Sequence, residues 1–96
     1  MQDKIEIEYT KSFLRLYKKL HPALKTETKE AIVKFQDKEN HVKLKLHKLS
    51  GKGEGKYSFS VNYSHRIIFQ YINENKVAVL MAVGDHDLYE DFLRNF

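Results

Sequence analysis

The chain has 96 residues, of which 42% are hydrophobic and 31% are charged, and it contains no cysteine. This balance excludes a disordered tail, so we expect a single domain over residues 1–96 without disulfide or thiolate chemistry. No apolar stretch reaches the roughly 18 residues of a membrane span, and the first residues lack the apolar core of a secretory signal. These features predict a cytoplasmic protein that binds no membrane.

The net charge of +4 is concentrated in one segment. Residues 43–56 contain five of the 17 basic residues and one of the 13 acidic ones, so the rest of the chain is neutral. A local basic patch favours a polyanion such as nucleic acid, although a lysine-rich surface that only keeps the protein soluble is the alternative. The lysines concerned, as candidate substrate-binding residues, are Lys43, Lys45, Lys48, Lys52 and Lys56.

The first half of the chain predicts a strand and two helices. Apolar and acidic residues alternate over residues 5–9, as in a half-buried strand. Thr10 is a suitable helix N-cap, and apolar residues three and four apart predict an amphipathic helix over residues 11–20. The dipeptide His21-Pro22 interrupts this pattern, and a second helix is expected over residues 22–37.

The second half predicts short strands that pair antiparallel. Alternation over residues 42–47 would put the lysines and His47 on one face of a strand. Further strands are expected over residues 57–61, 66–72 and 76–83, the last apolar enough to be covered on both faces, and a short helix over residues 88–96. The predicted fold is α+β: an N-terminal strand, a two-helix hairpin, a mainly antiparallel four-stranded sheet and a short C-terminal helix, with the helices on one sheet face.

The five histidines prompt a search for metal ligands and acid–base pairs. No two have the four-residue spacing of a helical zinc site, and cysteine is absent, so we expect neither a metal nor a cofactor. His21, His41 and His65 fall at turns or beside proline, where a surface position is the simplest interpretation. Residues 50–56 superficially resemble a phosphate-binding loop, but they open a strand rather than a helix.

His47 and His86 are better candidates for chemistry. His47 lies beside the basic segment, and His86 directly follows the central strand, where reactive side chains are common. Each of them, taken alone, is also compatible with an ordinary surface histidine.

Four motifs in order resemble the RelE/ParE superfamily, the toxins of bacterial type II toxin–antitoxin pairs. They are His-x-Leu-x-Gly at residues 47–51, Gly-Lys-Tyr-Ser-Phe-Ser-Val at 55–61, His-Arg-Ile-Ile-Phe at 65–69 and Val-Gly-Asp-His-Asp-Leu-Tyr at 83–89. The first and last favour the RelE, YafQ and YoeB side, whose members cut mRNA on the ribosome. ParE-like toxins, which inhibit DNA gyrase and lack a histidine pair, fit less well. The resemblance implies a RelE-like fold and a cognate antitoxin.

The resemblance also implies residue roles. His47 matches the general base, Arg66 the arginine that contacts the scissile phosphate, and His86 the general acid. Tyr89 matches an aromatic residue that stacks on or orients a nucleotide.

Two positions depart from this pattern. Ser60 and Ser64 stand where some relatives carry a histidine and an acid, so activity here is expected to be weaker, differently tuned or lost.

The residue types make chemical sense of these roles. Metal-free RNA cleavage needs a base for the 2′-hydroxyl, an acid for the leaving 5′-oxygen and a cation for the phosphorane. Lysines around His47 favour its neutral form, whereas Asp85 and Asp87 favour protonated His86. Arg66 supplies a cation that keeps its proton.

The resemblance therefore implies a ribosome-dependent endoribonuclease that acts on mRNA and is neutralised by an antitoxin, and the basic patch is expected to contact rRNA. The alternatives are a non-enzymatic, ParE-like gyrase inhibitor and a degenerate relative that only binds its antitoxin.

Overall fold

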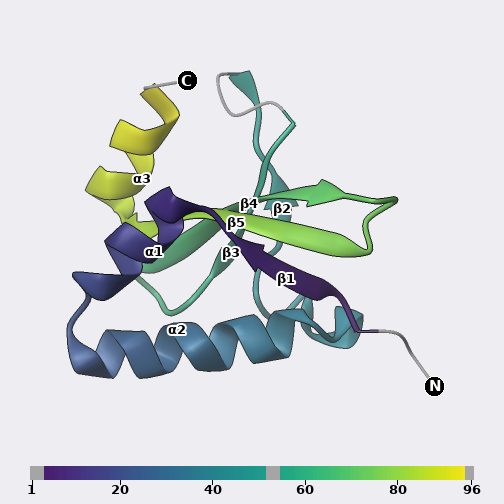
Figure 1. Ribbon diagram of the computed structural model, residues 1–96, viewed down its shortest axis with the longest axis horizontal. Coiled ribbons are helices and arrows are strands. Elements are labelled where there is room, and N and C mark those ends of the chain that lie inside the picture. Colours follow the sequence, from purple (N-terminus) through teal and green to yellow (C-terminus); the bar gives the residue numbers. More distant parts are fainter. Residues whose placement is uncertain (1–3, 52–54, 95–96) are drawn as a thin grey trace.

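The computed structural model describes residues 4–51 and 55–94, apart from the side chains of Tyr89 and Leu93 (Figure 1). Five strands form one sheet in the order β1-β5-β4-β3-β2. Strand β1 (Glu6–Tyr9) pairs parallel with β5 (Val77–Asp85). The remaining pairs are antiparallel and join β5 to β4 (His65–Ile72), β4 to β3 (Tyr57–Ser60) and β3 to β2 (His47–Lys48). The predicted α+β fold with a mainly antiparallel sheet is confirmed.

Helices α1 (Lys11–Lys18) and α2 (Pro22–Phe35) form the predicted hairpin, and α2 runs below the sheet in Figure 1. The Thr10 hydroxyl accepts a hydrogen bond from the Phe13 amide at 3.0 Å and donates one to the Leu80 carbonyl at 3.1 Å. It therefore caps α1 and ties the start of that helix to β5. Pro22 occupies the first turn of α2, where its missing N–H costs nothing.

An aromatic cluster fills the core between this hairpin and the sheet. Phe35, at the end of α2, is fully buried and stacks on Phe59 with ring centroids 4.4 Å apart. It meets Phe69 edge-on at 4.8 Å. Such pairs contribute about 0.5–1.5 kcal/mol each beyond the area that they bury. The cluster thus fixes α2 against the middle of the sheet.

The prediction of a strand over residues 42–47 is wrong for residues 42–46. A short 3₁₀-helix, η1 (Lys38–Asn40), continues into turns in which the Leu44 amide donates to the Asn40 carbonyl at 3.0 Å. Lys45 has a φ of 56°, in the left-handed region that costs a non-glycine residue about 1–2 kcal/mol. Leu44 is buried, but Val42 is 89% exposed. The alternation came from a turn that buries one leucine, and only residues 47 and 48 pair as a strand.

The C-terminal helix α3 (His86–Arg94) lies above the sheet in Figure 1, on the other side of it from α2, so the expectation of helices on one face is wrong. Val83 belongs to the core under the hairpin, and Gly84, next along β5, faces the other side. A Cβ on Gly84 would lie 2.7 Å from the Leu88 Cβ, so glycine alone permits this approach. Strand β5 carries no polar side chain before Asp85, and most of its residues are buried, as in a strand covered on both faces.

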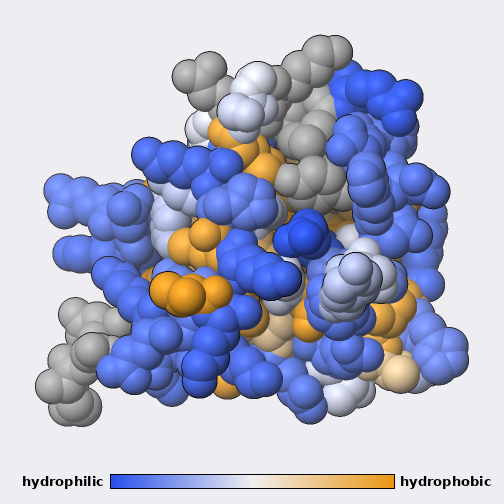
Figure 2. Space-filling model, turned by 180° about the vertical axis from the view of Figure 1, so that it is seen from behind, coloured by the Kyte–Doolittle hydropathy of each residue, from blue (hydrophilic) through white to orange (hydrophobic). Residues whose placement is uncertain are grey.

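Seen from behind, the surface is largely hydrophilic, and apolar side chains form only small, separate patches on that face (Figure 2). Of the helices within residues 4–51 and 55–94, none combines the length and the apolar character that crossing a membrane requires.

Candidate active site

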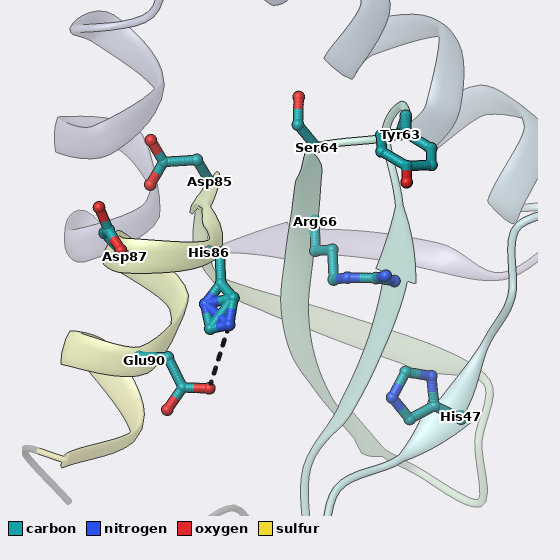
Figure 3. A pocket seen from close by; sticks show the side chains of 8 residues that line it. All are labelled: His47, Tyr63, Ser64, Arg66, Asp85, His86, Asp87 and Glu90. Atoms are coloured by element: carbon teal, nitrogen blue, oxygen red, sulfur yellow. Dashed lines mark ion pairs between the residues drawn. The ribbon is translucent and has the colours of Figure 1, made fainter.

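One open cleft of about 510 Å³ collects three of the predicted catalytic side chains (Figure 3). His47 comes from β2, Arg66 from β4 and His86 from the first position of α3. In Figure 3 the Arg66 side chain lies between the two imidazoles. We call this site the histidine cleft. It is lined by His47, Tyr63, Ser64, Arg66, Asp85, His86, Asp87 and Glu90.

The sheet register explains why these side chains meet. Arg66 pairs with Gly84, so it lies beside the end of β5, where α3 begins with His86. On its other side Arg66 pairs with Ser60, and His47 pairs with Ser58 two residues away on the same strand. Paired residues, and residues two apart on a strand, point to the same face of a sheet. Strands β2 to β5 thus present one continuous face, and α3 closes its end.

Two hydrogen bonds orient His47. Its Nδ1 lies 3.0 Å from the Lys45 carbonyl oxygen, and its Nε2 lies 3.4 Å from the hydroxyl of buried Ser58. A carbonyl can only accept, so in the neutral ring Nδ1 carries the proton and Nε2 presents its lone pair. The left-handed turn at Lys45 is what places that carbonyl. His47 can therefore take a proton at Nε2. The Ser58 hydroxyl, 3.4 Å away, can donate a hydrogen bond to the same atom.

Arg66 is half-buried, and its Nη1 donates to the Ser60 hydroxyl at 3.0 Å. The resemblance places Ser60 where some members of the family carry a histidine, and here the Ser60 hydroxyl accepts a hydrogen bond from the arginine. The guanidinium carries five donors in a planar fork, a geometry that matches a phosphate. Ser60, which departs from the family pattern, thus contacts Arg66, the residue expected to bind the phosphate.

His86 is exposed, and its acidic neighbour differs from the one expected. Its Nε2 lies 3.9 Å from Glu90 Oε1, one helical turn on. The Asp85 carboxylate instead accepts the Leu88 amide at 3.1 Å and caps α3. Figure 3 shows the Asp85 and Asp87 side chains pointing away from the imidazole. Glu90 was missed because the helix was predicted to begin at residue 88, which hid the four-residue spacing from His86.

The four predicted substrate-binding lysines that the structure describes fall into two separate pockets. Lys43 and Lys45 line a second cleft, which adjoins Arg66. Lys48 and Lys56 line a different pocket, together with residues 49–51, 55 and 57. Lys52 lies outside the described residues, as does the side chain of Tyr89, whose backbone belongs to α3.

The other histidines have structural contacts. His21 accepts the Ala23 amide at 3.1 Å and caps α2. His41 is half-buried, stacks on Phe35 at 4.9 Å and contacts the Phe35 carbonyl at 2.8 Å, so it is less of a surface residue than predicted. His65 interacts with Asn62 Oδ1 at 3.2 Å. Among the side chains that the structure describes, no three His, Cys, Asp or Glu are grouped to hold a metal ion.

No family model and no curated protein matches the chain. Solved structures do match. A mutant of the E. coli toxin RelE in the free state is 18% identical with a TM-score of 0.68, over 97% of this chain and 98% of that one. RelBE, the intact E. coli toxin–antitoxin complex, is 20% identical with a TM-score of 0.63, over 84% and 95% of the two chains. A YoeB/ParE toxin from Agrobacterium tumefaciens is 14% identical with a TM-score of 0.63, over 85% and 99%. These identities establish the fold alone, and the RelE-like fold that the motifs implied is confirmed.

Proposed function

We propose that this chain, which has the fold of the RelE/ParE toxins, is the toxin of a toxin–antitoxin pair and cleaves mRNA on the ribosome in the cytoplasm. The observation that carries the proposal is the shared cleft of His47, Arg66 and His86. It holds a proton acceptor, a permanent cation and a second imidazole, which are the groups that metal-free RNA cleavage requires.

The proposed reaction is an in-line transesterification. His47 Nε2 takes the proton of a 2′-hydroxyl, and the resulting oxygen attacks the adjacent phosphorus. Arg66 stabilises the negative charge of the phosphorane through its planar fork. His86 gives its proton to the 5′-oxygen as the bond from phosphorus to that oxygen breaks. The products are a 2′,3′-cyclic phosphate and a free 5′-hydroxyl, and the two histidines end in exchanged protonation states.

The contacts of the two imidazoles are consistent with opposite roles. The Lys45 carbonyl holds the His47 proton on Nδ1, which leaves Nε2 as the basic atom. Glu90 lies within ion-pair distance of His86 and can hold its imidazolium form. Both side chains of that pair are more than half exposed, so the ion pair is worth little to stability. We therefore assign Glu90 to orienting His86 rather than to holding α3 in place.

The proposed partners follow from the structural relatives. RelBE is a toxin–antitoxin complex, and a protein antitoxin is proposed for this chain as well. The ribosome is proposed as the place of cleavage because the sequence motifs resemble the toxins that cut mRNA there. Exposed lysines such as Lys48 are proposed to contact rRNA.

The test is cleavage by purified, antitoxin-free protein on ribosomes programmed with a defined mRNA, with 5′ ends mapped in the presence of EDTA. We expect discrete cuts whose upstream products carry a cyclic phosphate. Absence of cleavage between about pH 5 and 9, a range that spans histidine titration, would contradict the nuclease proposal. A DNA gyrase supercoiling assay on the same preparation then separates a gyrase inhibitor from a chain that only binds its antitoxin.

A further inference from the structure

A second cleft of about 890 Å³ adjoins the histidine cleft. Arg66 and Tyr63 line both clefts, so the two meet at these side chains. We call the second one the lysine cleft. It is lined by Lys34, Asn40, Lys43, Leu44, Lys45, Ser60, Val61, Asn62, Tyr63 and Arg66.

The two clefts differ in charge. The lysine cleft has four cationic side chains, and the described residues that line it include no acid. The Glu27 carboxylate, which is not among the lining residues, accepts a hydrogen bond from Asn62 at 3.1 Å. Lys34 comes from α2, outside the basic segment of the sequence, and meets Lys43 and Lys45 only in the folded chain. A concave surface with this charge concentrates polyanions.

Tyr63 supplies a different kind of contact at the boundary between the clefts. Its side chain is 99% exposed, the highest value among the large hydrophobic side chains that the structure describes. The turn beneath it is well held, because Asn62 Oδ1 accepts the amides of Ser64 and His65 at 2.9 Å each. A fixed turn thus presents an aromatic ring to solvent beside a basic groove. That combination is how proteins bind single-stranded nucleic acid: lysines follow the phosphates and the ring stacks on a base.

We infer that the lysine cleft binds the RNA strand on the 5′ side of the cleaved bond, with one base stacked on Tyr63. The direction rests on the proposed function. The nucleotide that loses its 2′-proton must lie against His47, and its chain continues toward the 5′ end. The His47 ring is hydrogen-bonded to the backbone carbonyl of Lys45, a residue that lines the lysine cleft. In Figure 3 His47 and Tyr63 lie on the side of Arg66 away from His86. The 3′ strand leaves past His86, along a wall that contains Asp85, Asp87 and Glu90.

The test compares two RNA tetranucleotides, both tetraadenylates, of equal length and charge. One carries a 3′-phosphate, which mimics the upstream product, and the other carries a 5′-phosphate. We expect the full chain to bind the 3′-phosphorylated RNA more tightly in fluorescence anisotropy. The triple variant Lys34→Gln, Lys43→Gln, Lys45→Gln should lose this preference, and the slope of log affinity against log salt should fall by about 2. A matched control, Lys11→Gln, Lys29→Gln, Lys76→Gln, has the same net charge and should keep both.

A second pair of variants tests the stacking. Tyr63→Ala should weaken binding of the 3′-phosphorylated RNA by about 5- to 150-fold, and Tyr63→Phe should retain it because the ring is kept. Equal binding of the two RNAs by the unmodified protein, or equal effects of the two lysine triples, would overturn the inference. Normal RNA binding by the triple variant Lys34→Gln, Lys43→Gln, Lys45→Gln would overturn it as well.

The binding measurement does not depend on cleavage. A chain that fails to cut mRNA but shows this lysine-dependent preference would refute the proposed nuclease and leave the binding site standing. A chain that cuts mRNA without the preference would refute the binding site alone.

Discussion

The histidine cleft and the lysine cleft share two side chains and differ in what the remaining ones can do. The first brings together two imidazoles and three carboxylates, of which Glu90 lies within ion-pair distance of His86. Imidazoles are the side chains best suited to exchanging protons near neutral pH. The second offers lysines and amides, whose charge is constant over that range. Proton transfer and strand binding are thus expected to be separable by mutation, with Arg66 and Tyr63 as the residues common to both clefts.

The largest expected effect is in the histidine cleft. His86→Ala should lower the single-turnover cleavage rate by about 10²–10⁴, because no group then protonates the leaving oxygen. The side chain is 77% exposed and alanine is a good helix former, so the melting temperature should stay unchanged. The lysine-cleft triple should instead raise the RNA concentration that gives half-maximal rate. A normally folded His86→Ala protein with full activity would remove His86 from the mechanism.

A loss of similar size is expected at His47, with a distinct pH signature. If one histidine is the base and the other the acid, the rate should be bell-shaped in pH. His47→Gln should slow cleavage by about 10²–10⁴ and abolish the fall on the acidic side, where the base gains its proton. A residue that only binds phosphate would weaken affinity and leave the rate at saturation nearly unchanged. Single-turnover rates from about pH 5 to 9 decide between these outcomes.

The sequence predicted the elements with regular periodicity and the identity of the clustered histidines. Residues 66–72 and 76–83 were recognised because continuous apolar strands leave little choice of structure. The turn at Lys45 was missed because a left-handed φ is normally predicted from a glycine, and this position is a lysine. The carbonyl of Lys45 in that turn also contacts His47. The contact that orients the candidate base was therefore missed together with the turn.

The lysine cleft was beyond sequence reasoning for a different reason. Lys34 was one of many charges on the surface of a helix, and its neighbours were assigned to a strand that does not form. Their proximity depends on how α2 ends and how η1 turns back, which is tertiary information. Ser58 was passed over as well, because a buried serine in an alternating strand carries no signal of its contact with His47.

Arg66→Lys probes the charged residue of the two that the clefts share. The substitution keeps the charge, but it loses the planar fork and the donor that now binds Ser60. We expect the cleavage rate to fall by about 10-fold or more, an effect smaller than removal of either histidine. RNA affinity at low salt should change little, since a point charge still attracts phosphate. Equal loss of rate and affinity would instead mean that Arg66 serves binding alone.

Gly84→Ala tests whether the placement of α3 matters for the histidine cleft. The new Cβ would meet the Leu88 Cβ at 2.7 Å, so α3 must shift, at a cost of about 1–3 kcal/mol. His86 begins that helix, and we expect reduced cleavage together with a lower melting temperature. Binding of the 3′-phosphorylated RNA should be retained, because α3 contributes no residue to the lysine cleft as described. Loss of both functions would show that the two clefts depend on each other.

The smallest expected effect lies away from both clefts and separates loss of fold from loss of chemistry at alkaline pH. Burial raises the pKa of Tyr71 above its ordinary 10.0, and nearby Tyr57 adds to the rise. The folded chain then holds this proton more tightly than the unfolded chain does. Its contribution to stability is complete below about pH 10 and is lost as pH rises through the higher folded value. Tyr71→Phe cannot ionise, so its melting temperature should decline less than that of the unmodified chain between pH 9 and about 11. Thermal melts by circular dichroism measure this difference, and parallel declines would exclude Tyr71 as the cause.

Histidines titrate several pH units lower. A fall in cleavage rate that begins well below pH 10 would therefore reflect the chemistry and not ionisation of Tyr71.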